Sequence, residues 1–405
     1  MKEKKFRLFL FLIAFIFIIS GAFLASLIAR GYRPDFSKGG ILPTGILVTT
    51  STPDGAQVYI DGKLKTATNN TINLSPGKYE VEIRKDGFYP WKKTLEIRKE
   101  LVTKTDALLF PTFPDLKALT FTGAQNPLLS PDGTKVVYSV STSSAVLSKQ
   151  GLWVLDLIDR PLGLNREPRQ IAVSSGKYDF AKSQYRWSPD SKQILVSFEF
   201  PQGKKLPPKK ENFLLDSERL TPPSELQDIT PTLNLLLASW QIEEKTKKDS
   251  QLAKLPPKLK EIITDKTKEI IFSPDEKKIL YTATASASLP EGIIPPPPAP
   301  STQKEEREIK PGRIYVYDLK EDKNFFITEE TSQKTVSWFP TSKHIFIVQN
   351  DKIIVKEYDG TNETVIYSGY FIDSFAFPFP SGNKILLLTN ISKDTPPNLY
   401  ALILR

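Results

Sequence analysis

A short turn motif recurs along the chain from residue 129 onward and restricts its fold more than any other feature. Three copies are closely similar, and two more distant copies follow. The copies begin at Leu129, Trp187, Phe272, Trp338 and Phe379. In such a turn, proline presets φ at the first corner, Asp bonds its own backbone, and Gly or Ser tolerates the tight exit. Each copy precedes a run rich in Val, Ile, Leu and aromatic residues, so each predicts a β-hairpin.

The turn residues of the three similar copies are the candidate site residues of the repeats. They are Ser130, Pro131, Asp132, Gly133, Ser188, Pro189, Asp190, Ser273, Pro274 and Asp275. Recurring carboxylates are also typical of calcium sites and glycosidases. However, Asp has a local backbone task in this turn, and the two distant copies carry Thr341 and Ser381 at that place. We therefore predict a structural role for these residues.

A long period repeated five times is typical of a propeller or a solenoid rather than of independent hairpins. The aromatic-Ser-Pro-Asp-Gly turn resembles that of the TolB-like, WD-repeat-like β-propeller family, over residues 113–405. This resemblance implies an all-β propeller of four-stranded blades in 112–405. Three stretches look like insertions: 201–212, 221–268 and 285–312. Without them, five blades have about 41 residues each, near the usual blade length.

Six blades fit the length equally well if residues 221–268 hide a blade, so the number stays open between five and six. Residues 240–268 are rich in Lys and Glu and lack the alternation of a strand. They predict one or two short helices broken at Pro256 and Pro257, which favours five blades.

The order of the strands also predicts how the ring closes. The chain ends with a third-strand run, residues 399–404, and segment 116–121 precedes the first turn without a blade of its own. Pairing the two would complete a blade and remove a sheet edge. In a meander blade, all three insertions emerge opposite the turn motifs. We interpret that face as the partner-binding face, with neutral variation of tolerant loops as the alternative.

The amino terminus predicts a membrane anchor. The stretch from Leu8 to Ala29 carries no charge. As a helix it spans about 33 Å, enough for a hydrocarbon core of about 30 Å. We predict a transmembrane helix over residues 8–30 after a basic tail, residues 1–7, whose cations favour a cytoplasmic N-terminus and an extracytoplasmic remainder. A cleaved signal peptide is the alternative, although its apolar region is normally about 7–15 residues.

A small domain precedes the repeats. Residues 31–44 predict a linker, and residues 45–110 predict short alternating strands, with a type I′ hairpin at Asp61-Gly62. This segment resembles the PEGA domain, a small β-sandwich of surface proteins named for a Pro-Glu-Gly-Ala turn. The corresponding residues are Pro53, Asp54, Gly55 and Ala56. We expect them to serve backbone geometry.

Two sets of aromatic residues allow a binding or a packing role. In the small domain, Phe88, Tyr89 and Trp91 would stack on a sugar if exposed together, but such residues more often plug the end of a sandwich. In the repeats, the residue two places before each motif proline is aromatic. These residues are Trp187, Phe272 and Trp338. We predict that they pack between blades.

The chain offers few groups for catalysis or metal binding. It has no cysteine and one histidine, His344, at a repeat position that we predict to be polar and solvent-facing. A Ser-His-Asp triad elsewhere and a histidine metal cluster are therefore excluded. The sequence contains no P-loop, dinucleotide fingerprint or Gly-x-Ser-x-Gly elbow. We expect no catalytic residue, no metal and no cofactor.

The net charge of +9 does not indicate a nucleic-acid partner. Residues 1–38 contribute +5 of it, so much of the basic character flanks the apolar segment. The remaining chain has a mixed surface rather than a basic patch.

Taken together, the sequence predicts a single-pass, membrane-anchored, extracytoplasmic protein of the cell envelope. Its propeller would bind or scaffold another envelope component, without enzymatic activity. One alternative is a cell-wall glycan-binding protein that uses exposed aromatic residues. Another is a hydrolase with two carboxylates about 5–10 Å apart in the propeller funnel.

Overall fold

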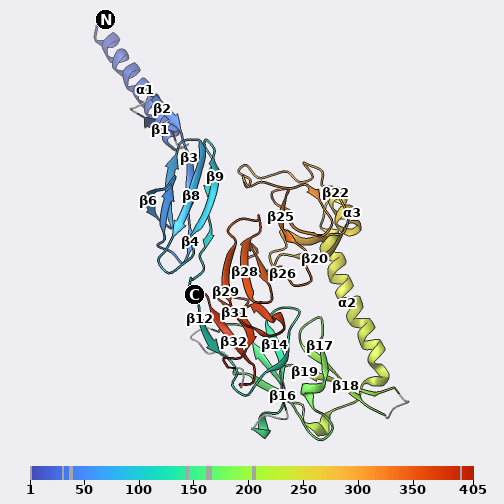
Figure 1. Ribbon diagram of the computed structural model, residues 1–405. Helices are drawn as coiled ribbons and strands as arrows, with labels where there is room; N and C mark the ends of the chain where they lie inside the picture. Colours follow the sequence, from blue (N-terminus) through green and yellow to red (C-terminus); the bar gives the residue numbers. More distant parts are fainter. Residues whose placement is uncertain are drawn as a thin grey trace. The chain divides into compact units, whose positions relative to one another are not determined.

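The computed structural model describes residues 2–29, 32–35, 40–141, 146–160, 167–202, 207–392 and 395–405. Residue 30 of the predicted membrane helix, residues 31 and 36–39 of the predicted linker, and residues 203–206 of the first predicted insertion lie outside these ranges. The chain divides into two compact units (Figure 1). Unit 1 contains Met1–Thr112 and Pro295–Lys304, and unit 2 contains Phe113–Ile294 and Glu305–Arg405. The two units are described separately.

Unit 1 begins with helix α1 (Lys2–Ala29), which extends into the predicted tail. Among the described residues, its segment Phe9–Ala29 is the stretch of helix long and apolar enough to cross a membrane. Its large apolar side chains are exposed. Such exposure is unfavourable in water and favourable in lipid, so the helix has the properties of a membrane anchor. Strands β1 (Tyr32–Asp35) and β2 (Gly40–Pro43) then pair antiparallel within the predicted linker.

The rest of unit 1 is a small β-sandwich, in agreement with the prediction. One sheet has the order β10-β3-β7, the other has the order β6-β5-β8-β9, and β4 pairs with β11. The strands are β3 (Gly45–Thr49), β4 (Ser51–Thr52), β5 (Gln57–Ile60), β6 (Lys63–Ala67), β7 (Asn70–Leu74), β8 (Gly77–Arg84), β9 (Trp91–Ile97), β10 (Val102–Lys104) and β11 (Ala107–Leu108). Alternate side chains such as Leu47, Val58 and Val81 meet in one buried core.

Two turns of the sandwich follow from local sequence. Asp61 and Gly62 both have positive φ, 48° and 73°, which confirms the predicted type I′ hairpin. In the Pro53–Ala56 turn, Gly55 has a φ of 67°. Ala56 lies fully buried in the core. Its N–H donates to Thr68 Oγ1 at 2.9 Å, and the Thr68 N–H donates to Ala56 O at 2.7 Å. This turn therefore connects the entry of β5 to the segment that leaves β6.

Within the described residues, unit 2 contains five blade sheets, numbered here in chain order, whose consecutive strands pair antiparallel. Blade 1 contains β13 (Gln125–Leu129), β14 (Lys135–Val140), β15 (Gly151–Asp156) and β16 (Arg169–Val173); blade 2 contains β17 (Gln184–Trp187), β18 (Gln193–Phe200) and β19 (Lys209–Asp216). Blade 3 contains β20 (Thr267–Phe272), β21 (Lys278–Ala283), β24 (Arg313–Asp318) and β25 (Lys323–Glu329). Blade 4 contains β26 (Thr335–Trp338), β27 (His344–Val348), β28 (Lys352–Glu357) and β29 (Thr364–Ser368).

Blade 5 combines both ends of unit 2, as predicted. Its strands are β30 (Ala376–Pro378), β31 (Lys384–Thr389), β32 (Asn398–Ile403) and β12 (Asp115–Ala118). Strand β12 pairs antiparallel with β32, with Leu116 opposite Leu402. The prediction of this pairing is confirmed, although the strand ends at Ala118 rather than at residue 121. Because β12 is the first strand of the unit and β32 the last, this pairing closes the ring.

Apolar clusters join neighbouring blades. One cluster combines Val136 and Tyr138 of blade 1 with Leu386 of blade 5, and others join blade 1 to blade 2 and blade 3 to blade 4. Trp187 and Trp338 lie in these joints. The Trp187 indole donates to Leu128 O at 3.0 Å and the Trp338 indole to Ile271 O at 2.9 Å, each in the preceding blade. The prediction that Trp187 and Trp338 pack between blades is confirmed. Phe272 instead packs against a cluster that combines blade 3 with residues 252–263.

Between blades 2 and 3 the joint is made by helices. Helix α2 (Leu233–Ala253) and helix α3 (Pro257–Asp265) break at Pro256-Pro257, as predicted, although α2 is longer than expected. Leu252 and Leu259 pack on Tyr281 of blade 3. Farther back along α2, Glu244 pairs with Arg186 of blade 2 at 3.0 Å. The helices thus occupy the position between two blades where a sixth sheet would stand (Figure 1), and unit 2 is a five-bladed propeller.

The other two predicted insertions need small adjustments. Strand β19 begins at Lys209, so residues 209–212 are strand rather than insertion. Within residues 285–312, strands β22 (Ala287–Ser288) and β23 (Glu308–Ile309) form a short antiparallel pair. Alternation of direction along each blade defines two faces. The turn face carries the turns between first and second strands, and the loop face carries the loops between second and third strands and between blades.

Candidate functional site

The recurring turn residues lie on the turn face, between the first and second strands of blades 1, 2 and 3. In blade 1, the Gly133 N–H donates to Ser130 O at 2.9 Å, which closes a four-residue turn. The Ser130 hydroxyl donates to Asp132 Oδ1 at 2.6 Å and accepts the Lys135 N–H at 2.9 Å. Blades 2 and 3 repeat the Ser-to-Asp contact at 2.7 Å: Ser188 to Asp190 and Ser273 to Asp275. The motif carboxylates therefore contact their own turns.

Hydrogen bonds in these turns stabilise the charged form of the carboxylates. Burial raises the pKa of Asp132, but hydrogen bonds from Ser130 and Thr134 outweigh that effect and hold the pKa below its usual value. In Asp190 the Ser188 hydrogen bond has the largest effect and also lowers the pKa. A carboxylate held ionised in this way is a poor general acid.

Two serines that sequence reasoning missed connect the turns of adjacent blades. Ser191 Oγ accepts the Asp132 N–H at 3.2 Å, and Ser342 Oγ accepts the Asp275 N–H at 3.0 Å. Both serines occupy the fifth position of their motifs, in blades 2 and 4, and both have φ near 60°. The sequence feature that could have indicated these contacts is the Ser that two motifs share at this position. A contact to the neighbouring blade cannot, however, be predicted from the sequence of one repeat.

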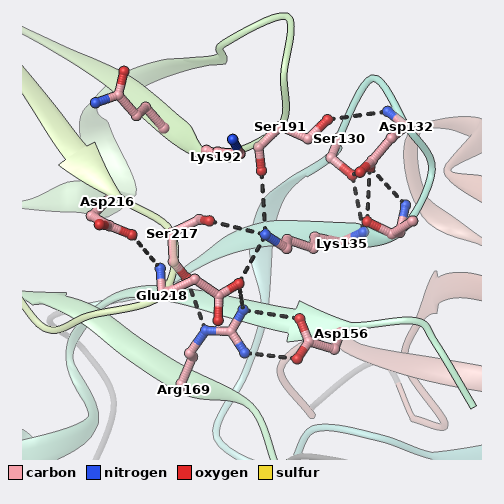
Figure 2. Close-up of polar contacts among 12 residues, drawn as sticks. Ser130, Asp132, Lys135, Asp156, Arg169, Ser191, Lys192, Asp216, Ser217 and Glu218 are labelled. Carbon is pink, nitrogen blue, oxygen red and sulfur yellow. Dashed lines mark hydrogen bonds and ion pairs between the residues drawn. The ribbon is translucent and has the colours of Figure 1, made fainter. Parts of the chain in front are cut away.

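A polar joint between blades 1 and 2 lies beside these turns (Figure 2). The Arg169 guanidinium donates to both Asp156 oxygens at 2.8 and 2.9 Å and to Ser217 O at 2.8 Å. The Lys135 ammonium lies 2.9 Å from Glu218 Oε1 and donates to Ser217 Oγ at 3.2 Å. Burial lowers the pKa of Arg169, but the Asp156 hydrogen bond and charge raise it overall. These groups neutralise one another and join two blades, so we assign them a structural task.

His344 is not solvent-facing, which corrects the prediction. Its side chain is 4% exposed, its Nδ1 lies 2.8 Å from Thr341 Oγ1, and its ring packs edge-on against Phe339. The equivalent Lys278 is also buried, with its ammonium 4.6 Å from the centre of the Tyr358 ring. This repeat position starts the second strand, and it is buried in blades 3 and 4 but exposed at Gln193 in blade 2. A polar tip with an apolar body suits such a place.

The loop face carries large exposed apolar side chains. The most exposed ones in loops of blades 1 and 5 are Phe121 (80%), Leu147 (76%), Tyr370 (66%) and Ile391 (79%). The loops around blade 5 are tied together. The Thr120 hydroxyl donates to Asn398 Oδ1 at 3.0 Å, and the Thr389 hydroxyl donates to Tyr370 O at 2.9 Å. Large exposed apolar side chains on loops are a feature of many protein interaction surfaces.

A buried carboxylate, Glu211, lies at the loop-face end of blade 2. Glu211 is 4% exposed and accepts hydrogen bonds from Lys177 at 2.7 Å, Lys209 at 2.8 Å and the Tyr178 hydroxyl at 2.8 Å. The hydrogen bonds from Lys177 and then Lys209 lower the pKa of Glu211 to about 2. Lys177 and Tyr178 precede blade 2, so Glu211 fastens the loop that leads into this blade.

Replacing Glu211 by glutamine is expected to destabilise unit 2 near neutral pH. Since the folded-state pKa is depressed, the stabilisation is present above the ordinary value of 4.5 and is lost as pH falls toward about 2. Because both lysines are about half exposed, we expect a loss of only roughly 1–2 kcal/mol at pH 7. Urea unfolding at pH 7 and pH 3 measures it. The difference between wild type and E211Q should shrink at pH 3, and an equal difference at both pH values would contradict this role.

The three aromatic residues of the small domain do not form one exposed platform. Trp91 is buried in the sandwich core, Phe88 packs against that core, and Tyr89 alone is exposed. Their main role is packing. Among the residues that the structure describes, no group of three or more His, Asp or Glu side chains is placed to hold a metal ion.

Comparison with known protein families supports the prediction of a PEGA domain in unit 1. The PEGA domain family matches residues 44–112, which include the Pro53–Ala56 turn and the two sheets described above. A comparison with curated protein sequences gives no match.

Several solved structures align with much of the chain. A structure described as putative TolB from Agrobacterium tumefaciens is 16% identical, with 71% of this chain and 75% of that chain covered and a TM-score of 0.21. TolB from Acinetobacter baumannii is 15% identical, with 80% and 59% covered and a TM-score of 0.21. Kuenenia stuttgartiensis hydrazine synthase is 11% identical, with 89% and 96% covered and a TM-score of 0.20. At such scores the folds do not superpose as wholes, and the blade assignment rests on the strand pairing of this chain.

These findings define the class of protein: an apolar amino-terminal helix, a PEGA-type sandwich, and a five-bladed propeller whose blades 2 and 3 are joined by helices. The recurring turn residues contact their own turns and the turns of adjacent blades. They lie in turns on one face, while Phe121, Leu147, Tyr370 and Ile391 lie in loops on the other.

Proposed function

We propose that this protein is a membrane-anchored, extracytoplasmic scaffold of the cell envelope that binds another envelope protein through the loop face of its propeller. The observation that carries the proposal is the set of exposed apolar side chains on that face, at Phe121, Leu147, Tyr370 and Ile391. Large exposed apolar residues on adjoining loops are typical of interaction surfaces. No catalytic activity is needed for this role.

The apolar helix and the charges that flank it support the proposed orientation of the protein in the membrane. The segment Phe9–Ala29 has the properties of a span, and the cations before it favour the cytoplasmic side. A single retained span would leave both units outside the cytoplasm. The absence of cysteine from the chain is compatible with any redox environment there.

The two alternatives have less support. For a glycan binder, an exposed aromatic platform would be needed, yet Trp91 is buried in the sandwich core. For a hydrolase built on the recurring carboxylates, Asp132 and Asp190 would have to face a substrate, but both accept hydrogen bonds within their own turns. We therefore propose a binding role.

Cysteine footprinting tests anchor orientation and the binding face in one experiment, because the chain has no cysteine of its own. Single cysteines replace Tyr370 on the loop face, Ile158 between the third and fourth strands of blade 1, or Lys4 in the tail. In cells with a sealed cytoplasmic membrane, an impermeant maleimide should label Y370C and I158C but not K4C. A bound partner should also slow the labelling of Y370C at least about threefold relative to the purified protein.

I158C is the matched control, because Ile158 is exposed on the turn face. Its labelling rate should be the same in cells and in the purified protein. Labelling of K4C without detergent would contradict the orientation. Equal rates for Y370C in cells and in the purified protein would contradict loop-face binding.

A further inference from the structure

A cavity of about 730 Å³ lies between blades 3 and 4. Its apolar lining includes Ile271, Leu280 and Val336, and its polar lining includes Glu269 and Thr331. Thr331 belongs to the loop that joins the two blades, so the cavity reaches the loop face. Its size is within the range of ligand pockets in proteins, about 300–1,000 Å³.

The equivalent place between blades 1 and 2 is filled by aromatic residues of the chain itself. Tyr185 lies two residues before Trp187, and Val336 lies two residues before Trp338. By the same alignment, Phe180 corresponds to Thr331. Phe180 and Tyr185 belong to the apolar cluster that joins blades 1 and 2, and Phe180 is fully buried. The cavity therefore exists because two aromatic side chains are replaced by Val336 and Thr331.

The strand that faces these positions is alike in both joints. Asn126 in blade 1 and Glu269 in blade 3 have φ of 49° and 53°, and each lies within a β-bulge. In blade 1 the Tyr185 hydroxyl donates to the carbonyl oxygens of Gln125 and Asn126 at this bulge. Val336 has no hydroxyl to offer the corresponding bulge in blade 3. The bulge in blade 3 thus lacks the phenol that its counterpart has.

Polar groups at the mouth of the cavity are of both signs. Glu330 pairs with Lys268 at 2.5 Å, and the Lys334 ammonium donates to Thr328 Oγ1 at 3.2 Å. Glu269 accepts a hydrogen bond from the Thr282 hydroxyl at 3.1 Å. This mixture disfavours a ligand of high net charge and suits the amide groups of a polypeptide.

We propose that this cavity receives an aromatic side chain, tyrosine or phenylalanine, from a segment of a partner protein. The inserted ring would take the place that Tyr185 has between blades 1 and 2, with a tyrosine hydroxyl directed to the bulge at Glu269. Two rings fill the equivalent space, so the cavity has room for the aromatic residue and a neighbour. This inference rests on the proposed function and adds the chemistry by which the loop face selects its partner.

Binding of N-acetyl-L-tyrosinamide to the full-length protein in detergent micelles tests the proposal. Saturation-transfer NMR, with empty micelles as the blank, should give a Kd on the order of 1 mM, as expected for so small a ligand. N-acetyl-L-leucinamide should bind at least about threefold more weakly. V336Y places the aromatic ring of the other joint into the cavity and should weaken tyrosinamide binding at least about tenfold.

V365Y is the matched control, because Val365 is exposed on the outer strand of the same blade; its binding should equal that of wild type. T331F should block the cavity as well, and since Thr331 is exposed, it decides the question if V336Y does not fold. Undetectable tyrosinamide binding, or unchanged binding in the folded blocking variants, would overturn the inference. Both measurements use purified protein, so they are independent of the footprint at Tyr370 that tests the proposed function.

Discussion

Replacing Gly151 by alanine is expected to lower the free energy of unfolding of unit 2 by about 3 kcal/mol or more. Gly151 begins β15 with a φ of 145°, and a Cβ there would lie 2.1 Å from the carbonyl oxygen of Ala172 in β16. The atom in the way is backbone, and it belongs to the paired strand. Strands β15 and β16 cannot separate without losing the hydrogen bonds between them, so the clash cannot be relieved locally.

Gly133→Ala is the matched control. Gly133 has a φ of 71°, but a Cβ there would meet no atom within 4 Å. Only the left-handed backbone conformation is penalised, at about 1 kcal/mol. Urea unfolding followed by tryptophan fluorescence compares the two variants. Equal stability of G151A and G133A would show that β15 and β16 do not approach as closely as described.

Ending the chain at residue 397 is expected to prevent unit 2 from folding. The truncation removes β32, which pairs with β31 on one side and with β12 on the other. It also removes Leu399, Tyr400, Leu402 and Leu404, all nearly fully buried. At about 2 kcal/mol for each such side chain, the loss is about as large as the whole stability of a typical domain, about 5–15 kcal/mol.

Ending the chain at residue 404 is the control, since it removes only Arg405 and its hydrogen bond to Gly382 O. Limited proteolysis should degrade unit 2 of the 397-residue variant and leave a protected fragment that contains the sandwich. A protease-resistant unit 2 in that variant would contradict ring closure by β12 and β32.

Features with a local cause could be predicted from the sequence. The Ser-Pro-Asp turns, the strands that follow them and the type I′ turn at Asp61-Gly62 depend on a few adjacent residues. The break at Pro256-Pro257 depends on the missing N–H of proline. Closure could also be predicted, because leftover strands at the two ends of a repeat array complete one another.

Features that depend on the neighbouring blade could not be predicted. His344 was expected at the surface because its repeat position is polar, yet adjacent structure covers that position. The Ser191 and Ser342 contacts join different blades. The cavity beside Val336 arises because Val336 and Thr331 stand where the joint between blades 1 and 2 has Tyr185 and Phe180. The length of segment 221–268 was compatible with either five or six blades. The structure shows that helices can occupy the place of a sheet, which a count of residues cannot distinguish.

The helical joint has a mechanical consequence. Residues 241–250 in the middle of α2 are exposed on all sides. Toward blade 3 the helix is held by an apolar cluster, whereas its polar link to blade 2 is the exposed Arg186–Glu244 pair beside the buried Trp240. An exposed ion pair contributes about 1 kcal/mol or less. When a mechanical force stretches the propeller ring, we expect the contact between α2 and blade 2 to break first. The sheets of the neighbouring blades should stay intact.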